Sequence, residues 1–337
     1  MRHGFFAIAM LVSICCRAAE TNSQLMLWYE RPAVKWTEAL PIGNGRIGAM
    51  IFGGTTREHL QLNEGTLWAG GPYDPNNTNA LAALPEVRRL VFAGEYDAAG
   101  KLIGEKMMAD PLRQMPYQTL GDLFLDFPTN AAVENYRRDL NLDDAVASVS
   151  YTANGVRFNR EIFASAPDQA IVIRLTADQP GQIAFKLGLT TPQSASVYIQ
   201  NSNTMAMIGE NAEARGIKGA LKFQAAVQVL AQNGRVTAEA RTISVTNADS
   251  VTLLVAAATS YNNYHDVSGH PRDIVKKRIA VAAKRSFAEL LAAHVADYQK
   301  LFHRVELNLG GSDAMQLPTD QRIAHFSEGK DPQLAAL

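Results

Sequence analysis

The feature that most constrains the fold is a long series of short β-strand patterns between about residues 27 and 261. In many of its segments apolar residues alternate with polar or small ones, as in strands with one buried face. Asn154-Gly155 lies between two such segments, 149–152 and 156–158, and is a strong hairpin signal. Asn233-Gly234 provides a second turn. Many strands separated by turn residues predict a large antiparallel β-sandwich.

Helical patterns interrupt and follow these strands. We expect a helical insert around residues 81–108. Residues 273–302 contain neither proline nor glycine, and their apolar residues recur at steps of three and four, which predicts one long amphipathic helix that docks on the sandwich. A last strand is expected at 305–309. New helical structure is expected from residue 318, and the uncapped apolar end at 334–337 indicates an interrupted helix.

Composition and charge limit the function classes. A chain of 337 residues with 47% hydrophobic content can build one or two domains with ordinary cores. A net charge of −1 does not provide the basic surface of a nucleic-acid-binding protein. After the N-terminal segment, no apolar run is long enough to cross a bilayer, so we expect no membrane span.

The N-terminus has the pattern of a secretory signal peptide. Met1-Arg2-His3 precedes an apolar run at residues 5–16, and Arg17-Ala18-Ala19 follows with small residues suited to cleavage. We predict that residues 1–19 are removed and that the protein is exported to the periplasm or the exterior. Both cysteines lie in this segment, so the mature chain would lack disulfides. A lipoprotein signal is the alternative, because Cys15 and Cys16 end the apolar run.

A glycine-rich stretch at residues 36–74 combines aromatic and short polar side chains. Trp36, Trp68 and Tyr73 occur there with asparagines and carboxylates, a combination suited to the apolar faces and hydroxyl edges of sugars. The alternative is a sheet corner with ordinary core aromatics. Residues 43–48 also match G-x-G-x-x-G, but only four apolar residues follow before Gly53-Gly54. That run predicts a strand instead of the helix that a nucleotide site requires.

Several motifs occur in order along the chain. They are W-T-E-A-L-P-I-G-N-G-R-I-G-A-M-I-F-G-G (36–54), L-Q-L-N-E-G-T-L-W-A-G-G-P-Y-D (60–74), Y-Q-T-L-G-D-L-F-L-D-F (117–127), F-A-S-A-P-D-Q (163–169), A-A-A-T-S-Y (256–261), A-D-Y-Q-K-L-F (296–302) and L-P-T-D-Q-R (317–322). These motifs resemble those of glycoside hydrolase family 95. The resemblance runs in order from about residue 27 to residue 337. Two residues depart from the expected N-E-D-T-L-W-S-G motif, because Gly65 replaces the aspartate and Ala69 the serine.

The resemblance implies an architecture and an activity. It implies a mainly β fold, with a β-sandwich (super-sandwich) domain at 25–270, a helical linker at 271–316 and the first residues of an absent (α/α)6 barrel at 317–337. Family members are mainly inverting α-L-fucosidases that act on fucosylated glycans, with some α-L-galactosidases. Their catalytic residues lie in the barrel, so no catalytic residue is assigned here, and the chain alone is predicted to be inactive.

The candidate substrate-binding residues are Asn63, Glu64 and Trp68, on a loop expected to reach the sugar pocket of the chain's own downstream barrel. The alternative for Trp68 is that it packs under Gly70-Gly71. The other candidates for a carboxylate pair have no spacing that favours catalysis; they are Glu38, Asp74, Asp122 and Asp126. His265 and His270 lack metal-site spacing, and His294 and His303 are expected to be packed or solvated, so no metal site or cofactor is predicted.

Two function classes follow from the sequence. The first is the N-terminal part of an exported glycoside hydrolase of the fucosidase type, with a fucosylated oligosaccharide or polysaccharide as substrate. The second is a non-catalytic carbohydrate-binding or scaffold sandwich. Sequence that encodes a barrel downstream of Leu337 would favour the first, and a stop codon would favour the second.

Overall fold

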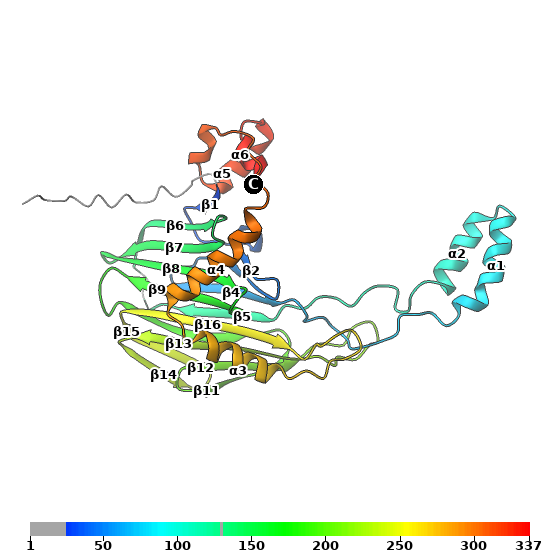
Figure 1. The fold of residues 1–337 in the computed structure, drawn as a ribbon, viewed down its shortest axis with the longest axis horizontal. Helices are drawn as coiled ribbons and strands as arrows, with labels where there is room; N and C mark the ends of the chain where they lie inside the picture. The colour runs from blue at the N-terminus through cyan, green and yellow to red at the C-terminus, as the bar shows by residue number, and fades with distance from the viewer. Residues whose placement is uncertain (1–24, 129–130) are drawn as a thin grey trace, which may run out of the picture. The chain divides into compact units, whose positions relative to one another are not determined.

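Two β-sheets form the framework of the protein (Figure 1). The computed structural model describes residues 25–128 and 131–337, so the predicted signal peptide lies outside the described residues. The chain divides into two compact units, one formed by Leu27–Glu306 and one that includes Leu307–Leu337. In its described residues the first unit contains the sheets, four α-helices and the short 3-10 helix η2 (Trp36–Glu38), and the second contains short helices.

Both sheets are antiparallel, and within the described residues one has nine strands and the other seven. The larger sheet contains, in spatial order, β1 (Met26–Tyr29), β6 (Val133–Asn141), β7 (Val146–Ala153), β8 (Val156–Ser165), β9 (Ala170–Ala177), β16 (Ser250–Thr259), β13 (Lys222–Gln232), β12 (Thr204–Glu210) and β11 (Ser194–Asn201). The smaller contains β14 (Arg235–Glu239), β15 (Thr242–Ala248), β10 (Ile183–Thr190), β5 (Gly121–Asp126), β4 (Arg57–Glu64), β3 (Ile47–Ile51) and β2 (Leu40–Gly43). The predicted antiparallel sandwich is therefore confirmed.

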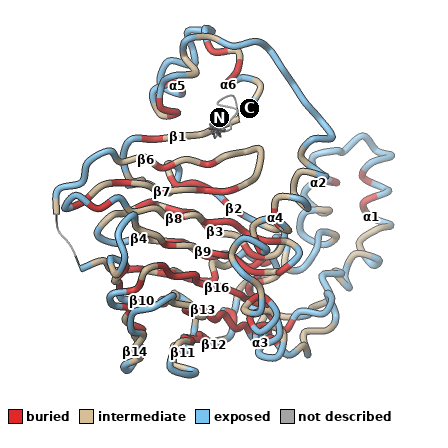
Figure 2. The backbone as a smooth tube through the Cα atoms, turned by 60° about the vertical axis from the view of Figure 1, so that its left-hand side comes forward, coloured by how far each residue is buried: buried red, intermediate tan, exposed pale blue. Residues whose placement is uncertain are grey.

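The main core lies between the two sheets (Figure 2). Along β4 every second residue is buried, including Leu60 and Leu62, because one face of this strand packs inward. Along β16 all ten residues are buried. This strand is covered on both faces, since its other face lies under a helix, and its sequence accordingly contains a continuous apolar run from Leu253 to Ala258.

The two Asn-Gly turns have the same local geometry but connect their strands in different ways. Asn154 and Gly155 have φ values of 52° and 73°, and Asn233 and Gly234 have values of 57° and 72°. The first turn joins β7 to β8 as a hairpin within one sheet. The second leads from β13 in the larger sheet to β14 in the smaller one. Gly234 is required there, because a Cβ would lie 2.6 Å from the backbone of Ala248.

The segment that matched G-x-G-x-x-G is a β-hairpin. β2 ends at Gly43, and β3 begins at Ile47 and pairs antiparallel with it. Asn44 closes the turn, because its Oδ1 accepts hydrogen bonds from the backbone N–H groups of Arg46 and Ile47. No helix follows that could present its N-terminus to a phosphate, which agrees with the strand prediction.

The helical insert consists of two helices, α1 (Ala80–Phe92) and α2 (Tyr96–Lys106), which pack against each other. The expectation of a single long helix over 273–302 was wrong. The structure has α3 (Pro271–Ala282) and α4 (Phe287–Phe302) in its place. The helices are separate because Ser286 caps the N-terminus of α4. Its side chain accepts a hydrogen bond from the backbone N–H of Glu289, and the Glu289 carboxylate accepts one from the backbone N–H of Ser286.

Both of these helices cover the larger sheet, as expected for the linker (Figure 1). Val275 and Ile279 of α3 pack against the alanine-rich outer face of β13 and β16. Leu290 of α4 packs against Phe163 of β8. The outer face of the larger sheet is therefore partly buried under the helices, and this explains why its strands carry apolar residues on both faces.

The predicted strand at 305–309 was also wrong, because these residues have no partner strand in the described chain and no regular structure. The second unit then contains η3 (Asp313–Gln316), α5 (Thr319–Ala324), η4 (Phe326–Glu328) and α6 (Pro332–Ala336). Within it Arg322 donates two hydrogen bonds of 2.7 Å to the Asp331 carboxylate. None of the helices in the described residues is long and apolar enough to cross a membrane.

Candidate functional site

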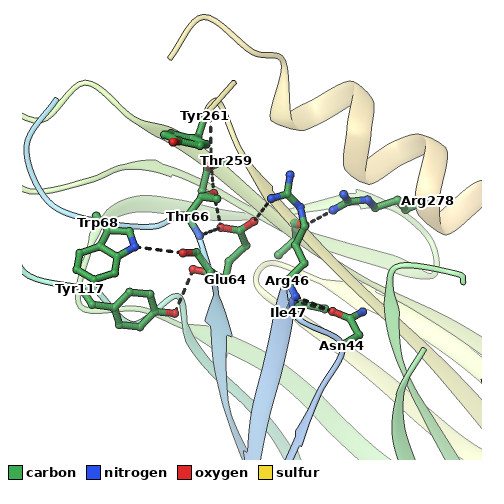
Figure 3. Close-up of polar contacts among 12 residues, drawn as sticks. Asn44, Arg46, Ile47, Glu64, Thr66, Trp68, Tyr117, Thr259, Tyr261 and Arg278 are labelled. Carbon is green, nitrogen blue, oxygen red and sulfur yellow. Dashed lines mark hydrogen bonds and ion pairs between the residues drawn. The ribbon is translucent and has the colours of Figure 1, made fainter. Parts of the chain in front are cut away.

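Three segments that are far apart in the sequence meet at one end of the sandwich (Figure 3). The first is the turn at residues 65–73 that follows β4, and the second is the loop at 261–267 that follows β16. The third is the segment at 114–117, where Tyr117 forms an isolated β-bridge with Trp68. The ends of β4 and β16 therefore determine where the candidate loop lies.

Glu64 lies at the end of β4 and points into the protein. It belongs to the inward-facing residues of this strand and is fully buried. Its Oε2 accepts hydrogen bonds from the backbone N–H of Thr66 at 2.7 Å and from the Thr66 hydroxyl at 2.6 Å (Figure 3). The Thr66 hydroxyl also contacts the Thr259 hydroxyl at the end of β16. Glu64 thus fixes the turn, and Thr66 connects the turn to the end of β16.

Arg46 lies beside the other Glu64 oxygen, and Arg278 interacts electrostatically with both residues. Oε1 is buried without a hydrogen-bond partner among the described residues, and Arg46 Nη1 lies 3.6 Å from it. Arg278 of α3 donates a 2.6 Å hydrogen bond to the carbonyl of Ala257. Burial lowers the pKa of Arg278, and the Arg46 charge lowers it further, whereas Glu64 raises it. Arginine titrates so far above neutral pH that Arg278 keeps its charge.

Trp68 lies at the surface. Its side chain is 42% exposed, and its Nε1 donates a 3.1 Å hydrogen bond to the Gly65 carbonyl. Its ring meets the ring of Tyr117 edge-on, with centroids 5.4 Å apart. The Tyr117 hydroxyl donates to the Glu64 carbonyl at 3.0 Å, and burial raises the pKa of Tyr117, so the phenol stays neutral. Trp68 is therefore held at its edge while one face remains open.

A cleft of about 560 Å³ lies in front of Trp68. Its walls are the turn after β4 and the loop after β16, and they present four aromatic side chains together with neutral polar groups. The cleft is lined by Gly65, Thr66, Trp68, Ala69, Gly70, Gly71, Pro72, Tyr73, Pro75, Gln114, Met115, Leu221, Tyr261, Asn263, Tyr264 and Val267.

The three candidate substrate-binding residues have different positions. Trp68 lines the cleft, Glu64 lies beneath the turn, and Asn63 points to the outer face of β4, where it pairs with Gly48 of β3. Adjacent residues of a strand point to opposite sides, so Asn63 and Glu64 cannot face the same ligand. Sequence reasoning did not select Tyr264 or Asn263. The sequence signal that could have identified them is the group of aromatic and amide residues directly after the buried β16 segment.

The other flagged carboxylates have local partners. Glu38 accepts hydrogen bonds from two backbone N–H groups, and Asp74 accepts one from Asn76. Asp122 contacts His59 at 2.6 Å, and Asp126 pairs with Arg57. None of these carboxylates lines the cleft.

The histidines are also accounted for. His294 is buried and donates from Nε2 to the carbonyl of Asp144 at 3.0 Å, while the more exposed His303 contacts the Asp143 carboxylate at 2.7 Å. The His265 ring contacts the Tyr264 ring in a tilted arrangement, with centroids 3.9 Å apart. In the described part of the chain, no three histidine, cysteine or acidic side chains come together as metal ligands.

Comparison with known proteins places these features in a family context. Residues 27–264 match the family "Glycosyl hydrolase family 65, N-terminal domain", and residues 286–337 match "Glycosyl hydrolase family 95 catalytic domain". The chain is 36% identical to "Alpha-L-fucosidase 2" of Arabidopsis thaliana, over 94% of this chain and 41% of the relative. It is 28% identical to "Probable alpha-fucosidase A" of Aspergillus niger, over 96% of this chain and 43% of the relative.

The chain therefore spans less than half the length of these curated relatives. Among solved structures, a putative kojibiose phosphorylase from the human microbiome matches with a TM-score of 0.46 and 9% identity, over 91% of this chain and 41% of that chain. A bacterial glucoamylase in complex with acarbose matches with a TM-score of 0.31 and 8% identity, over 82% and 40%. With such low TM-scores and identities, these structural matches do not support any functional assignment.

Proposed function

Since the chain belongs to the family of glycosyl hydrolase family 65 N-terminal domains, and its last residues match the beginning of a family 95 catalytic domain, we propose that it is the N-terminal part of an exported α-L-fucosidase. The substrate would be a fucosylated oligosaccharide or polysaccharide. The partner of the sandwich would be the (α/α)6 barrel of the same polypeptide. Hydrolysis would invert the configuration at the anomeric carbon.

The observation that carries the proposal is the similarity to a plant α-L-fucosidase along nearly the whole chain. It extends through the sandwich, the linker helices and the first part of the catalytic domain. The cleft supports the proposal independently, because exposed aromatic rings next to neutral polar groups are suited to a sugar. Since the chain spans under half of the relatives, the activity of a whole enzyme is inferred from them.

The proposed division of labour follows from the chemistry. Inverting hydrolysis requires an acid and a base on opposite sides of the glycosidic bond, about 6.5–9.5 Å apart. Within the described residues no acidic side chain lines the cleft, so the sandwich would supply binding surface and the barrel would supply both catalytic groups. Trp68 is the residue of this chain that we expect to contact the glycan.

The test is an activity assay on the complete protein, produced from the gene extended beyond the codon for Leu337. We expect turnover of an aryl α-L-fucoside, with the β-anomer of fucose as the first product in a proton NMR time course. An aryl α-L-galactoside serves as the comparison substrate. Failure to release either sugar, or release of the α-anomer first, would contradict the proposal.

A non-catalytic carbohydrate-binding or scaffold sandwich is the second candidate. The uncharged aromatic cleft without an acid or base favours it. Sequencing the DNA past the codon for Leu337 separates the two: barrel-coding sequence supports the enzyme, and an immediate stop codon supports the binding module.

Export is part of the proposal and rests on the N-terminal pattern of residues 1–19. We expect N-terminal sequencing of the exported protein to start near residue 20. A protein that still begins at Met1 would contradict export by this signal, and one that begins at an acylated Cys15 or Cys16 would favour the lipoprotein alternative.

A further inference from the structure

The cleft collects aromatic rings from two loops almost two hundred residues apart. Trp68 is 42% exposed, Tyr261 38% and Tyr264 73%. Leaving large rings in contact with water forgoes the free energy of burial, so a group of them around one concave surface marks a binding site more often than isolated exposed residues do. The volume of 560 Å³ lies within the range of about 300–1,000 Å³ typical of ligand pockets.

The polar groups of the cleft are all uncharged. Thr66, Gln114 and Asn263 contribute hydroxyl and amide groups, and no lysine, arginine, histidine, aspartate or glutamate is among the sixteen lining residues. Asn263 Oδ1 already accepts from the backbone N–H groups of His265 and Asp266, which leaves its amide N–H groups as donors. Such a lining can pair with sugar hydroxyls, but it offers no counter-charge for a carboxylate, sulfate or phosphate.

The walls are held in position by partly buried hydrogen bonds. The Thr259 hydroxyl, bound to Thr66 of one wall, accepts a 3.2 Å hydrogen bond from the backbone N–H of Tyr261 in the other (Figure 3). Asn211 Nδ2 donates to the carbonyl of Trp68 at 2.7 Å. Behind the cleft, a Cβ on Gly71 would lie 2.8 Å from that of Ala220, so the backbone segments touch. A cleft fixed in this way loses little conformational entropy when a ligand binds.

Among the described residues that line the cleft, none is an acid or base that could cleave a glycosidic bond. Glu64 lies beneath the turn with Oε2 engaged by Thr66. From these observations we propose that the cleft is a binding site for a neutral, non-reacting segment of an oligosaccharide, with Trp68, Tyr261 and Tyr264 as stacking platforms. This deepens the proposed function, on which it rests for the choice of a fucosylated probe.

The test measures binding to the full chain by tryptophan fluorescence and saturation-transfer NMR. The probes are 2′-fucosyllactose, lactose and digalacturonic acid, each up to about 10 mM, a range that still detects Kd values in the millimolar class. We expect both neutral sugars to bind and the dianionic one to bind at least about tenfold more weakly. Tighter binding of the acidic disaccharide, or no binding of either neutral sugar, would overturn the proposal.

Matched variants locate the site. Tyr264→Ala and Trp68→Ala should each weaken binding of the neutral sugars at least about tenfold, a loss of about 1.4 kcal/mol. Tyr96→Ala on α2 and Trp36→Ala remove rings of similar exposure, 70% and 55%, that do not line the cleft, and should leave binding unchanged. Wild-type affinity in both cleft variants would overturn the assignment.

The outcome is separable from that of the proposed function. Binding to the full chain requires no catalysis, whereas fucoside turnover by the complete protein requires the barrel. Neutral-sugar binding without fucosidase activity would reject the proposed enzyme and keep the site. Fucosidase activity together with a cleft that binds neither neutral sugar would keep the proposed enzyme and reject the site. Thermal unfolding of each variant checks that lost binding does not reflect lost folding.

Discussion

The Glu64 carboxylate accepts two hydrogen bonds from Thr66, one from its backbone N–H and one from its hydroxyl. These bonds are partly buried, and the turn that carries Trp68 cannot shift without breaking them. We propose that Glu64, a candidate substrate-binding residue from the sequence, acts in this chain as a positioning residue.

The first prediction concerns this carboxylate. Glu64→Ala should lower the free energy of unfolding by about 1–3 kcal/mol, because it leaves the Thr66 donors without their acceptor. Glu64→Gln retains an acceptor oxygen and should cost less. Denaturant titration measures both. Glu134→Ala, which removes an exposed glutamate of β6, is the control and should change stability by less than about 0.5 kcal/mol. Equal stability of Glu64→Ala and wild type would contradict the positioning role.

The second prediction compares two neighbouring residues. Leu67 is fully buried, so Leu67→Ala should cost about 2–5 kcal/mol. Trp68→Ala should cost only about 0.5–1.5 kcal/mol, mainly the edge-on contact with Tyr117. In a complete relative with a tryptophan at the matching position, Trp→Ala should lower kcat/KM while leaving the melting temperature nearly unchanged. A fall in melting temperature as large as that of Leu67→Ala would assign Trp68 to the core.

The third prediction concerns pH. Burial lowers the pKa of His294, although nearby backbone carbonyls and the Asp297 charge oppose this effect. In the unfolded chain the histidine takes up a proton near pH 6.5, while the folded chain resists protonation until lower pH. The free energy of unfolding should therefore fall as the pH decreases below about 6.5, by at most about 1.4 kcal/mol per pH unit from this residue.

Two histidine variants test the assignment in urea titrations at several pH values. His294→Gln keeps a donor toward the Asp144 carbonyl and cannot become charged, so its stability should depend less on pH between about 5 and 6.5. His303→Gln replaces a more exposed histidine at the end of the same helix and serves as the control. An unchanged pH slope in His294→Gln would show that another group dominates.

The fourth prediction is that residues 20–337 alone do not hydrolyse an aryl α-L-fucoside. Inverting hydrolysis needs two groups about 6.5–9.5 Å apart across the bond, and no acidic side chain lines the cleft. A complete relative with fucosidase activity serves as the positive control. Turnover that survives repurification and disappears in Glu64→Gln would place the catalytic centre in this chain.

The two Asn-Gly turns show how far local sequence determines the fold. Both dipeptides adopt the left-handed backbone that their residues favour. Only contacts with distant residues decide that Asn154-Gly155 closes a hairpin and that Asn233-Gly234 passes the chain to the other sheet. The break between α3 and α4 is the opposite case: Ser286 and Glu289 form a local capping box, and apolar periodicity alone overlooked it.

The sequence by itself determined the class of fold, because alternating apolar residues can bury one face only in packed antiparallel sheets. It also located the turn at residues 65–71, because its glycines permit close backbone approach. Only the tertiary structure decided that Glu64 is buried and that Tyr264 faces the same cleft as Trp68. The physical reason is that the direction of a strand residue follows from which face meets the core, and the neighbours of a loop follow from sheet order. The residues of the loop by themselves determine neither the direction of the strand residue nor the neighbours of the loop.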